Sequence, residues 1–205
     1  MRRTKEAAEN TRKRIMEGAL DLFIEKGFSN TSLTEIAHSL GITKGVVYWH
    51  FKNKEDILLQ IVKRHCEAKI QEAVNALSDP MPEQTLYSFY KKSLNCFTSD
   101  ERFIRVYNLL SQNHSWPEDL RNRVFDMLHD AGLKERGIVT AHIKKAQEAG
   151  AIRGDIEAEK IAVVITSVFN GLYMLQTKDL LPPEFFMYDK LIFEPFSQTL
   201  ASLNL

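Results

Sequence analysis

The chain has 205 residues, of which 44% are hydrophobic and 26% are charged, as in an ordinary globular protein with a buried core. No window approaches the roughly eighteen apolar residues of a membrane span, and residues 1–14 lack the apolar centre of a signal peptide, so a cytoplasmic protein is expected. The 27 basic and 27 acidic residues cancel, yet residues 1–14 hold six basic residues against two acidic ones. A positive charge confined to one end is expected where only that part meets a polyanion.

The first four predicted helices follow one another closely. In the first, apolar residues recur at helical spacing, and Gly27 stands where a helix commonly ends. Asn53 is well placed to cap the fourth helix, with Asp56 in its first turn. We expect helices over about 11–26, 33–40, 44–51 and 54–77.

The second and third of these helices have the features of a helix-turn-helix. Ala37 is small enough for the helices to cross closely, and Gly41 can take the left-handed conformation of a tight turn. Thr43 is expected to cap the third helix with its side chain. The apolar side chains expected between the two helices are Ile36, Leu40, Ile42 and Val47.

The third helix carries side chains suited to the major groove of DNA. Lys44 supplies charge for phosphate or a donor for guanine, and Gly45 allows close approach to the groove floor. Residues 48–50 are consecutive, so they cannot all lie on one buried stripe, whereas Phe51 is expected in the core. Any two helices around a glycine can imitate this motif, and aromatic residues are more often core. The candidate DNA contacts are Thr43, Lys44, Gly45, Tyr48, Trp49, His50 and Lys54.

Two prolines within residues 78–84 end the fourth helix. Further helices are expected over about 83–97, 100–113, 157–178 and 187–203. Another is expected from Pro117 to Gly150, with Gly132 and Gly137 as candidate points of a break or bend. The sequence therefore predicts an all-α fold of about nine helices. Residues 1–55 would form a DNA-binding domain and residues 56–205 a second domain, with the helix over 54–77 connecting them.

The helix over 157–178 is apolar on nearly every side, and the helix over 187–203 has a similar excess. Such helices need cover, which a second copy of the chain would supply by pairing across a two-fold axis. A monomer with one central helix is the alternative. The candidate interface residues are Ile161, Ile165, Val168, Leu172, Phe193, Phe196 and Leu200.

The second domain is rich in aromatic residues with amide and imidazole groups near them, as in a pocket for a small apolar or aromatic molecule. Packing alone also accounts for each aromatic taken singly. The candidate ligand residues are Phe97, Phe103, Tyr107, Leu110, His114, Trp116, Phe125, Phe169 and Asn170.

Residues 11 to about 60 resemble the N-terminal domain of the TetR family of bacterial transcriptional regulators. The resemblance rests on "ALDLFIEKGF", "TSLTEIA" and "YWHFKNKED". The opening "RRTKEAAENTR" with "YWHF" is similar, more narrowly, to the branch that represses multidrug efflux pumps. The resemblance implies that the candidate DNA contacts occupy the family's contact positions. It also implies the dimer, and a pocket lined by the segment "RFIRVYNLLSQNHSW".

The resemblance adds two groups of candidate DNA contacts. Ser32 or Thr34, at the start of the second helix, would meet phosphate. Arg2, Arg3 and Lys5 would reach the adjacent minor groove, although a solvated terminus explains them as well. "SQNHSW" has no carboxylate, which favours neutral or amphipathic aromatic effectors over cationic drugs.

The leading hypothesis is a dimeric, ligand-responsive repressor of an efflux or stress operon, released from a palindromic operator by an apolar or aromatic molecule. A DNA-binding regulator without a small-molecule effector and a sensor of fatty-acyl compounds are the alternatives. Cys66 and Cys96 stand far apart and the histidines are scattered, so no metal or other cofactor is expected. No nucleophile motif or phosphate loop supports an enzyme.

Overall fold

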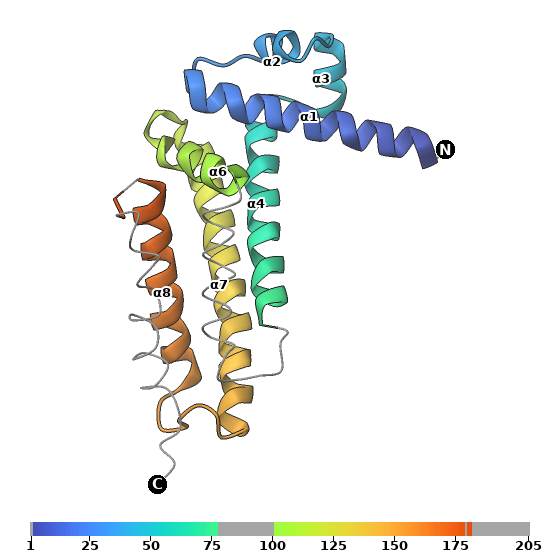
Figure 1. Cartoon of the computed structure of the whole chain (residues 1–205). Helices are drawn as coiled ribbons and strands as arrows, with labels where there is room; N and C mark the ends of the chain where they lie inside the picture. The colour runs from blue at the N-terminus through green and yellow to red at the C-terminus, as the bar shows by residue number, and fades with distance from the viewer. Residues whose placement is uncertain (1, 78–100, 179, 182–205) are drawn as a thin grey trace. The chain divides into compact units, whose positions relative to one another are not determined.

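The structure, a computed structural model, describes residues 2–77, 101–178 and 180–181, and this part of the chain is helical (Figure 1). The expected all-α fold is confirmed for these residues, whereas the expected helices over 83–97 and 187–203 lie outside them. The described helices are α1 (Arg2–Lys26), α2 (Leu33–Ser39), α3 (Lys44–His50), α4 (Lys54–Ala76), α6 (Glu101–Ser111), the short 3-10 helix η1 (Asn113–Ser115), α7 (Glu118–Glu148) and α8 (Ala158–Thr177).

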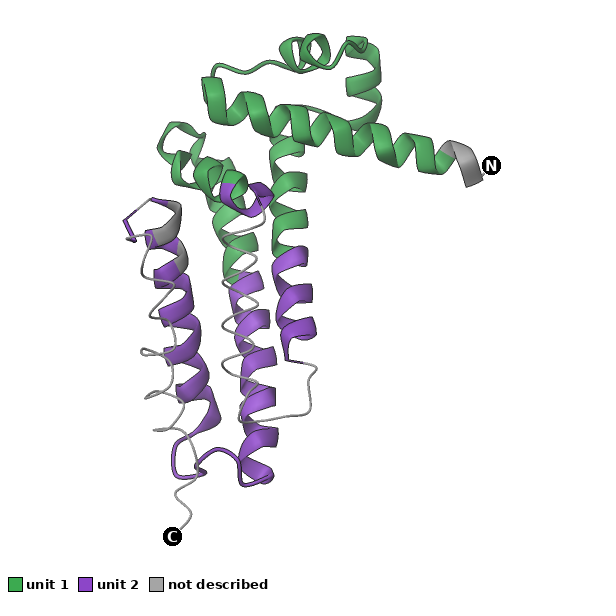
Figure 2. Cartoon of the chain, in the orientation of Figure 1, with its two compact units in different colours: residues 1–66, 105–129 green, residues 67–104, 130–205 purple. Residues whose placement is uncertain are grey.

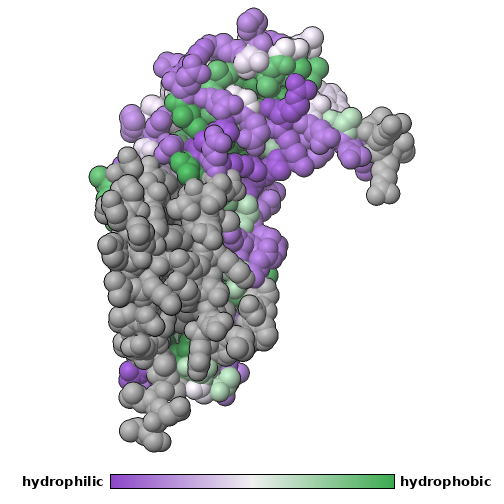
Figure 3. Space-filling view, viewed as in Figure 1, coloured by the Kyte–Doolittle hydropathy of each residue, from purple (hydrophilic) through white to green (hydrophobic). Residues whose placement is uncertain are grey.

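Helix α1 begins at Arg2 rather than near Thr11, so the charged N-terminal segment is part of the helix. This segment consists mostly of strong helix formers, and Lys5 and Glu9 stand one turn apart with opposite charges. On the face of the molecule visible in Figure 3, α1 is mostly hydrophilic. The apolar side chains of α1, such as Ile15 and Phe23, are buried.

Helix α7 is continuous through Gly132 and Gly137, the two candidate points of a break. Among the described residues, no atom outside the backbone of α7 itself and the adjoining residues lies within 4 Å of the place a Cβ would take at either glycine. A glycine inside a helix costs about 1 kcal/mol relative to alanine. The burial of Val139 and Ile143 on the same helix offsets that cost.

Contacts divide the chain into two compact units, coloured separately in Figure 2. The first comprises residues 1–66 and 105–129, and the second comprises residues 67–104 and 130–205. The division of the chain at residue 55 into a DNA-binding part and a second functional part stays a prediction. Among the largest fully buried side chains of the first unit are Ile15, Leu20, Phe23, Ile36, Phe51, Ile57, Leu58 and Ile61.

The core of the second unit is built where α4, α7 and α8 pack together. Small side chains let these helices approach closely, and branched side chains fill the space between them. Among the described residues, no helix is both long enough and apolar enough to cross a membrane. The buried residues of this core are Ala73, Ala76, Leu77, Val139, Ile143, Ala146, Ile152, Ala158, Ile161, Ala162 and Ile165.

Candidate nucleic-acid interface

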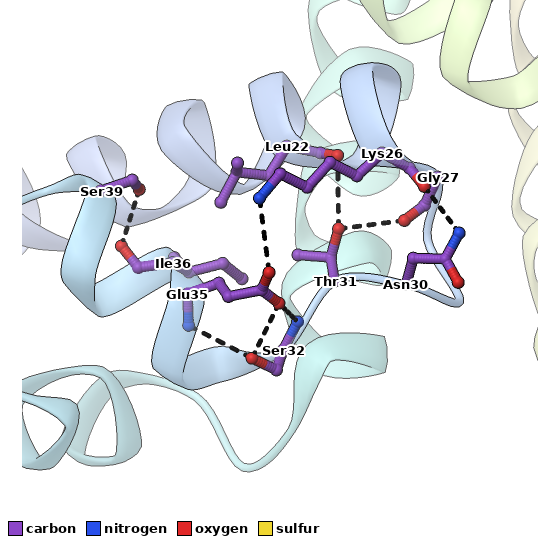
Figure 4. Close-up of polar contacts among 9 residues, drawn as sticks. All are labelled: Leu22, Lys26, Gly27, Asn30, Thr31, Ser32, Glu35, Ile36 and Ser39. Atoms are coloured by element: carbon purple, nitrogen blue, oxygen red, sulfur yellow. Dashed lines mark hydrogen bonds and ion pairs between the residues drawn. The ribbon is translucent and has the colours of Figure 1, made fainter.

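The turn between α1 and α2 is held by side chains that bond the last carbonyls of α1 (Figure 4). Gly27 has φ +84°, the left-handed conformation that ends the helix. The amide of Asn30 donates to the carbonyl of Lys26 at 3.0 Å. The hydroxyl of Thr31, which is buried, donates to the carbonyls of Gly27 at 2.9 Å and Leu22 at 3.3 Å. The entry to α2 is therefore fixed relative to the end of α1.

A capping box starts α2 (Figure 4). The hydroxyl of Ser32 accepts from the amide of Glu35 at 3.2 Å, and the carboxylate of Glu35 accepts from the amide of Ser32 at 2.9 Å. The hydrogen bonds from Ser32, helped by Lys26 at 3.4 Å, hold the pKa of Glu35 below its usual value. The spacing Ser-x-x-Glu was the available sequence signal for this cap.

The turn between α2 and α3 has the expected geometry. Gly41 has φ +64°, which confirms its predicted left-handed conformation, and the amide of Ile42 donates to the carbonyl of Ala37 at 3.0 Å. No role was predicted for Gly18 of α1. A Cβ at Gly18 would come within 2.8 Å of the side chain of Leu40, so the absence of a side chain lets Leu40 pack against α1.

Thr43 stands at the N-cap of α3, but its side chain makes no capping hydrogen bond, so that prediction is wrong. Its hydroxyl lies beside Gly45 instead, 3.8 Å from the place a Cβ would take there. A β-branched side chain has few rotamers, and this one does not reach the first amides of the helix. The hydroxyl of Thr43 is therefore not used to cap its own helix.

Helix α3 has a buried face and an exposed face, as predicted. Val47 and Phe51 are buried with 0% and 1% of their surface exposed, and they anchor the helix to the core. On the other face, 51% of Tyr48 and 71% of Trp49 is exposed, far more than packing predicts for such large side chains. The ammonium of Lys44 lies 5.4 Å from the centre of the Tyr48 ring. These three residues form one exposed surface, which we call the α3 face.

His50 differs from the α3 face because it is half-buried. Burial, and then the charge of Arg12, lower the pKa of its imidazole. Arg12 of α1 donates from Nη1 to the carbonyl of His50 at 3.0 Å, and its guanidinium carbon lies 4.5 Å from the centre of the Phe51 ring. In the sequence, Arg12 is one of the six basic residues of the charged N-terminal end, and no contact with α3 was predicted for it. Its place three residues before buried Ile15 was a signal that it faces inward.

Lys54, predicted to contact phosphate, directs its ammonium into the protein. The Nζ atom donates to the carbonyls of Phe28 at 2.8 Å, Ser29 at 3.0 Å and Thr31 at 3.0 Å. It also lies 4.7 Å from the centre of the Phe28 ring. An ammonium has three N–H donors, so all of them are used within the chain. Burial lowers the pKa of Lys54.

The expected cap of α4 is confirmed. The side chain of Asn53 accepts from the amide of Asp56 at 2.8 Å. The carboxylate of Asp56 accepts from the amide of Lys52 at 3.1 Å. These bonds fix the residues that lead from α3 into α4.

Thr34 is exposed on α2, and Arg3 lies in the first turn of α1. The contacts of these two residues with DNA stay predictions.

Residues 15–61 match the family of bacterial regulatory proteins called tetR. The transcriptional repressor BepR of Brucella suis is 29% identical over 173 residues, which cover 83% of this chain and 82% of BepR. Residues 15–61 thus form a tetR-type N-terminal domain. A structure of NalD from Pseudomonas aeruginosa is titled the secondary repressor of the MexAB-OprM multidrug efflux pump. Its alignment covers 96% of this chain and 98% of NalD, with 25% identity and a TM-score of 0.70. A second structure is titled SmeT–triclosan complex. Its alignment covers 80% of this chain and 79% of the SmeT chain, with 23% identity and a TM-score of 0.68.

The ligand residues predicted from the sequence fall in both units. Leu110, Trp116 and Phe125 line one hollow of about 270 Å³ in the first unit. Its other lining residues are the apolar Val124 and Leu128 and the polar Asn113, Arg121 and Asn122. Most of Trp116 is buried, whereas 65% of Phe125 is exposed and its ring stacks on His129. Tyr107 is half-buried and His114 is exposed in the same unit.

The second unit holds Phe103, which is buried, and Phe169, which is half-buried. Asn170 accepts a hydrogen bond from Lys69 at 3.0 Å, and Lys69 forms an ion pair of 2.9 Å with Glu135. Phe97 lies outside the described residues. The predicted ligand role of these residues stays a prediction. Within the described residues, no three His, Cys, Asp or Glu side chains are grouped to hold a metal ion.

The residues predicted at a dimer interface are placed differently along α8. Ile161 and Ile165 are buried in the core of their own unit, because this face of α8 packs on α4 and α7. By contrast, 41% of Val168 is exposed, and Leu172 is half-buried. The exposed apolar residues of α8 are Val163, Val164, Val168 and Met174. Phe193, Phe196 and Leu200 lie outside the described residues.

Proposed function

We propose that the chain is a ligand-responsive DNA-binding repressor that acts in the bacterial cytoplasm as a homodimer on a palindromic operator of an efflux or stress operon. The observation that carries the proposal is the α3 face, where Lys44, Tyr48 and Trp49 are presented to solvent on a helix whose opposite side is anchored by Val47 and Phe51. A folded protein gains nothing from exposing this much aromatic surface unless a partner covers it.

The size and chemistry of α3 suit the major groove. A short helix enters the groove with its first residues against the base edges, and Gly45 leaves room there for the backbone. Lys44 supplies a cation for phosphate or guanine, and the apolar rings with polar tips at Tyr48 and Trp49 suit thymine methyls and sugars. The hydroxyl of Thr43, unused as a cap, is a further donor at this end.

The proposal of a homodimer is supported by the apolar residues that α8 exposes. Val164 and Val168 are one turn apart, with 49% and 41% of their surface exposed. Leucine or valine in solvent is ordinary when single, but adjacent residues on one helix form a patch that a partner covers. A two-fold pair of chains would present two α3 helices to one palindrome.

The repression of an efflux or stress operon is proposed from the relatives, because BepR is named a repressor and NalD a repressor of an efflux pump. Release by an apolar or aromatic effector is proposed from the hollow lined by Leu110, Trp116 and Phe125. The indole of Trp116 also lies 6.0 Å from the ring of Phe28, at the turn before α2. An effector that displaces Trp116 would therefore disturb the turn from which α2 begins.

Other bonds of the first unit join the same region to α1. The hydroxyl of Ser29 donates to the carbonyl of Ser115 at 2.8 Å. Arg105 of α6 pairs with Asp21 and, at 3.7 Å, with Glu17. A change around α6 and η1 would act on α1 through these bonds. The mechanism proposed for release is thus a shift of α6 and η1 that weakens the placement of the helix-turn-helix.

DNA binding is tested by fluorescence anisotropy with the DNA upstream of the protein's own gene. We expect a complex that forms at nanomolar protein, weakens steeply as salt rises, and outcompetes an unrelated duplex. No preference for any site in that DNA, at low or moderate salt, would refute the proposed repressor.

Effector binding is tested separately with a Trp49→Phe variant, whose fluorescence then comes from Trp116 alone. Flavonoids, triclosan, bile salts and acyl-CoAs are added one at a time, and melting temperature is measured in parallel. One class is expected to change the emission and to raise the melting temperature by several degrees. A response to acyl-CoAs alone would indicate a lipid sensor. No response of the variant, together with intact DNA binding by the wild-type chain, would indicate a regulator without a small-molecule effector.

A further inference from the structure

Two cations of the first unit are used on backbone carbonyls at helix ends, and neither lies on the α3 face. The first is Arg12, which donates to the carbonyl of His50, the last residue of α3, at 3.0 Å. Its guanidinium stacks on Phe51, the residue that follows. A cation at this place both satisfies a carbonyl that the helix leaves unbonded and interacts favourably with the C-terminal end of the helix dipole.

The second cation is Lys54, whose three donors go to the carbonyls of Phe28, Ser29 and Thr31. These carbonyls belong to the turn through which the chain passes from α1 into α2. Lys54 itself is the first residue of α4. One ammonium therefore ties the start of α4 to the entry of α2.

Together the two side chains act at both ends of the helix-turn-helix. Helices α2 and α3 have seven residues each, and helices this short are not stable without tertiary contacts. Lys54 holds the chain just before α2, and Arg12 holds it just after α3. Two bonded cations, one from α1 and one from α4, thus stand at the two ends of the helix-turn-helix.

We infer that Arg12 and Lys54 are positioning residues for DNA recognition, which hold the recognition helix in place without contacting DNA phosphate. The inference rests on the proposed function, because it assigns these residues a part in operator binding. It replaces the predicted phosphate contact of Lys54.

Three possible roles of these cations have different signatures in DNA binding. A lysine that contacts phosphate contributes to every duplex alike, and its removal lowers the slope of log affinity against log salt by about one. A residue that only stabilises the fold changes the melting temperature and leaves the affinity of the folded protein unchanged. A positioning residue lowers affinity for the operator but not for unrelated DNA, and it leaves the salt slope unchanged.

The experiment uses the full-length chain and a duplex that the wild-type protein selects from a random-sequence pool. Affinities for this duplex and for a scrambled one are measured by anisotropy from about 50 to about 200 mM salt, well below the melting temperature of each variant. Lys54→Met keeps the side-chain stem over Phe28 and removes the donors, and Arg12→Met does the same over Phe51. Lys44→Met serves as the comparison for a residue at the DNA surface, and Lys52→Met removes the same charge from an exposed neighbour.

We expect Arg12→Met and Lys54→Met to lower the ratio of operator to scrambled affinity by about tenfold each, because a hydrogen bond to a charged group is lost at each site. Their salt slopes stay at the wild-type value. Lys52→Met leaves the ratio unchanged. A slope that falls by about one for Lys54→Met with an unchanged ratio overturns the inference in favour of a phosphate contact. A changed melting temperature with unchanged binding overturns it in favour of a purely structural role.

Lys54→Arg keeps the positive charge and gives a second test of the inference in case Lys54→Met does not fold. A phosphate contact is preserved by arginine, whereas three converging carbonyls fit a compact ammonium better than a planar guanidinium. We therefore expect Lys54→Arg to lower the ratio as well, and full retention of the wild-type ratio overturns the inference for Lys54.

Amide hydrogen exchange separates this inference from the proposed function. Arg12→Met is expected to speed exchange at the amide of Phe51, which bonds the carbonyl of Val47 at 2.9 Å, and Lys54→Met at the amide of Ser32. If the wild-type chain selects no DNA sequence, the proposed repressor fails. Unchanged exchange at both amides then overturns the positioning role as well, and faster exchange leaves the two cations as the determinants of helix placement.

Discussion

The α3 face and the exposed side of α8 are two surfaces of one chain that are determined in different ways. The α3 face is fixed by bonds within residues 12–56, most of them between groups that are close in sequence. The capping box of Ser32 and Glu35 and the turn at Gly41 are examples. On α8, Val164 and Val168 remain exposed although the opposite side of the helix is packed. The first surface is formed within a single chain, whereas the second is the one that we propose a second copy of the chain covers.

The largest effect is expected when a charge is placed on the exposed face of α8, which tests whether this face forms a dimer interface. Val168→Glu would bury an unpaired carboxylate in the proposed dimer interface, which costs several kcal/mol. We expect sedimentation velocity to show a dimer for the wild type and a monomer for the variant, with operator affinity reduced about a hundredfold or more. Val74→Glu, at a similarly exposed valine of α4, is the control and leaves the dimer intact. A dimeric Val168→Glu protein would show that α8 does not form the interface.

A second substitution tests whether the α3 face binds DNA or is exposed to solvent without contacting DNA. Tyr48→Ala removes an exposed ring, so the free energy of unfolding changes by less than about 0.5 kcal/mol. Operator binding, in contrast, is expected to weaken by about 1–3 kcal/mol, the usual worth of a good base contact. Urea unfolding and anisotropy measure the two effects. Equal operator affinity for the variant and the wild type would remove Tyr48 from the DNA surface.

The local bonds of the helix-turn-helix are tested by Ser32→Ala. Loss of the N-cap of α2 is expected to lower the free energy of unfolding by about 1 kcal/mol. Ser39→Ala serves as the matched control, since the hydroxyl of Ser39 donates only to the carbonyl of Ile36 within the same helix (Figure 4). Thermal unfolding followed by circular dichroism should show the larger shift for Ser32→Ala. Equal shifts would show that the capping box contributes no more than an ordinary surface hydroxyl.

The smallest expected effect is a pH dependence that comes from His50. Burial and the charge of Arg12 place the pKa of His50 in the folded chain below the usual 6.5. Between these two pKa values, the unfolded chain therefore binds more protons than the folded chain. The free energy of unfolding therefore rises with pH from the folded pKa up to about 6.5. His142 of the second unit has its pKa lowered in the same direction, so wild type and His50→Gln must be compared. An NMR titration should also show a higher pKa for His50 in Arg12→Met, and an unchanged pKa would contradict the assigned contact.

The sequence predicted the local features around α3, but it did not predict contacts between residues that are far apart in the chain. Helix periodicity, Gly41 and Asn53 predicted the helices and turns around α3 because each signal is local. The inward direction of Lys54 was not predicted, since it depends on carbonyls more than twenty positions away in the chain. Burial of Ile161 and Ile165 was likewise missed, because the apolar stripe of α8 does not say which side meets its own chain. The ligand set stays a prediction for the same reason: its members come from segments far apart in sequence.

The central claim is that two α3 helices of a dimer read successive major grooves of one duplex. Hydroxyl-radical footprinting and base-contact interference on the selected duplex test it most directly. We expect two protected half-sites related by two-fold symmetry, with centres about 10 base pairs or a near multiple apart, and base contacts in the major groove that weaken in Tyr48→Ala. A single unsymmetrical footprint, or contacts unaffected by changes on the α3 face, would contradict it.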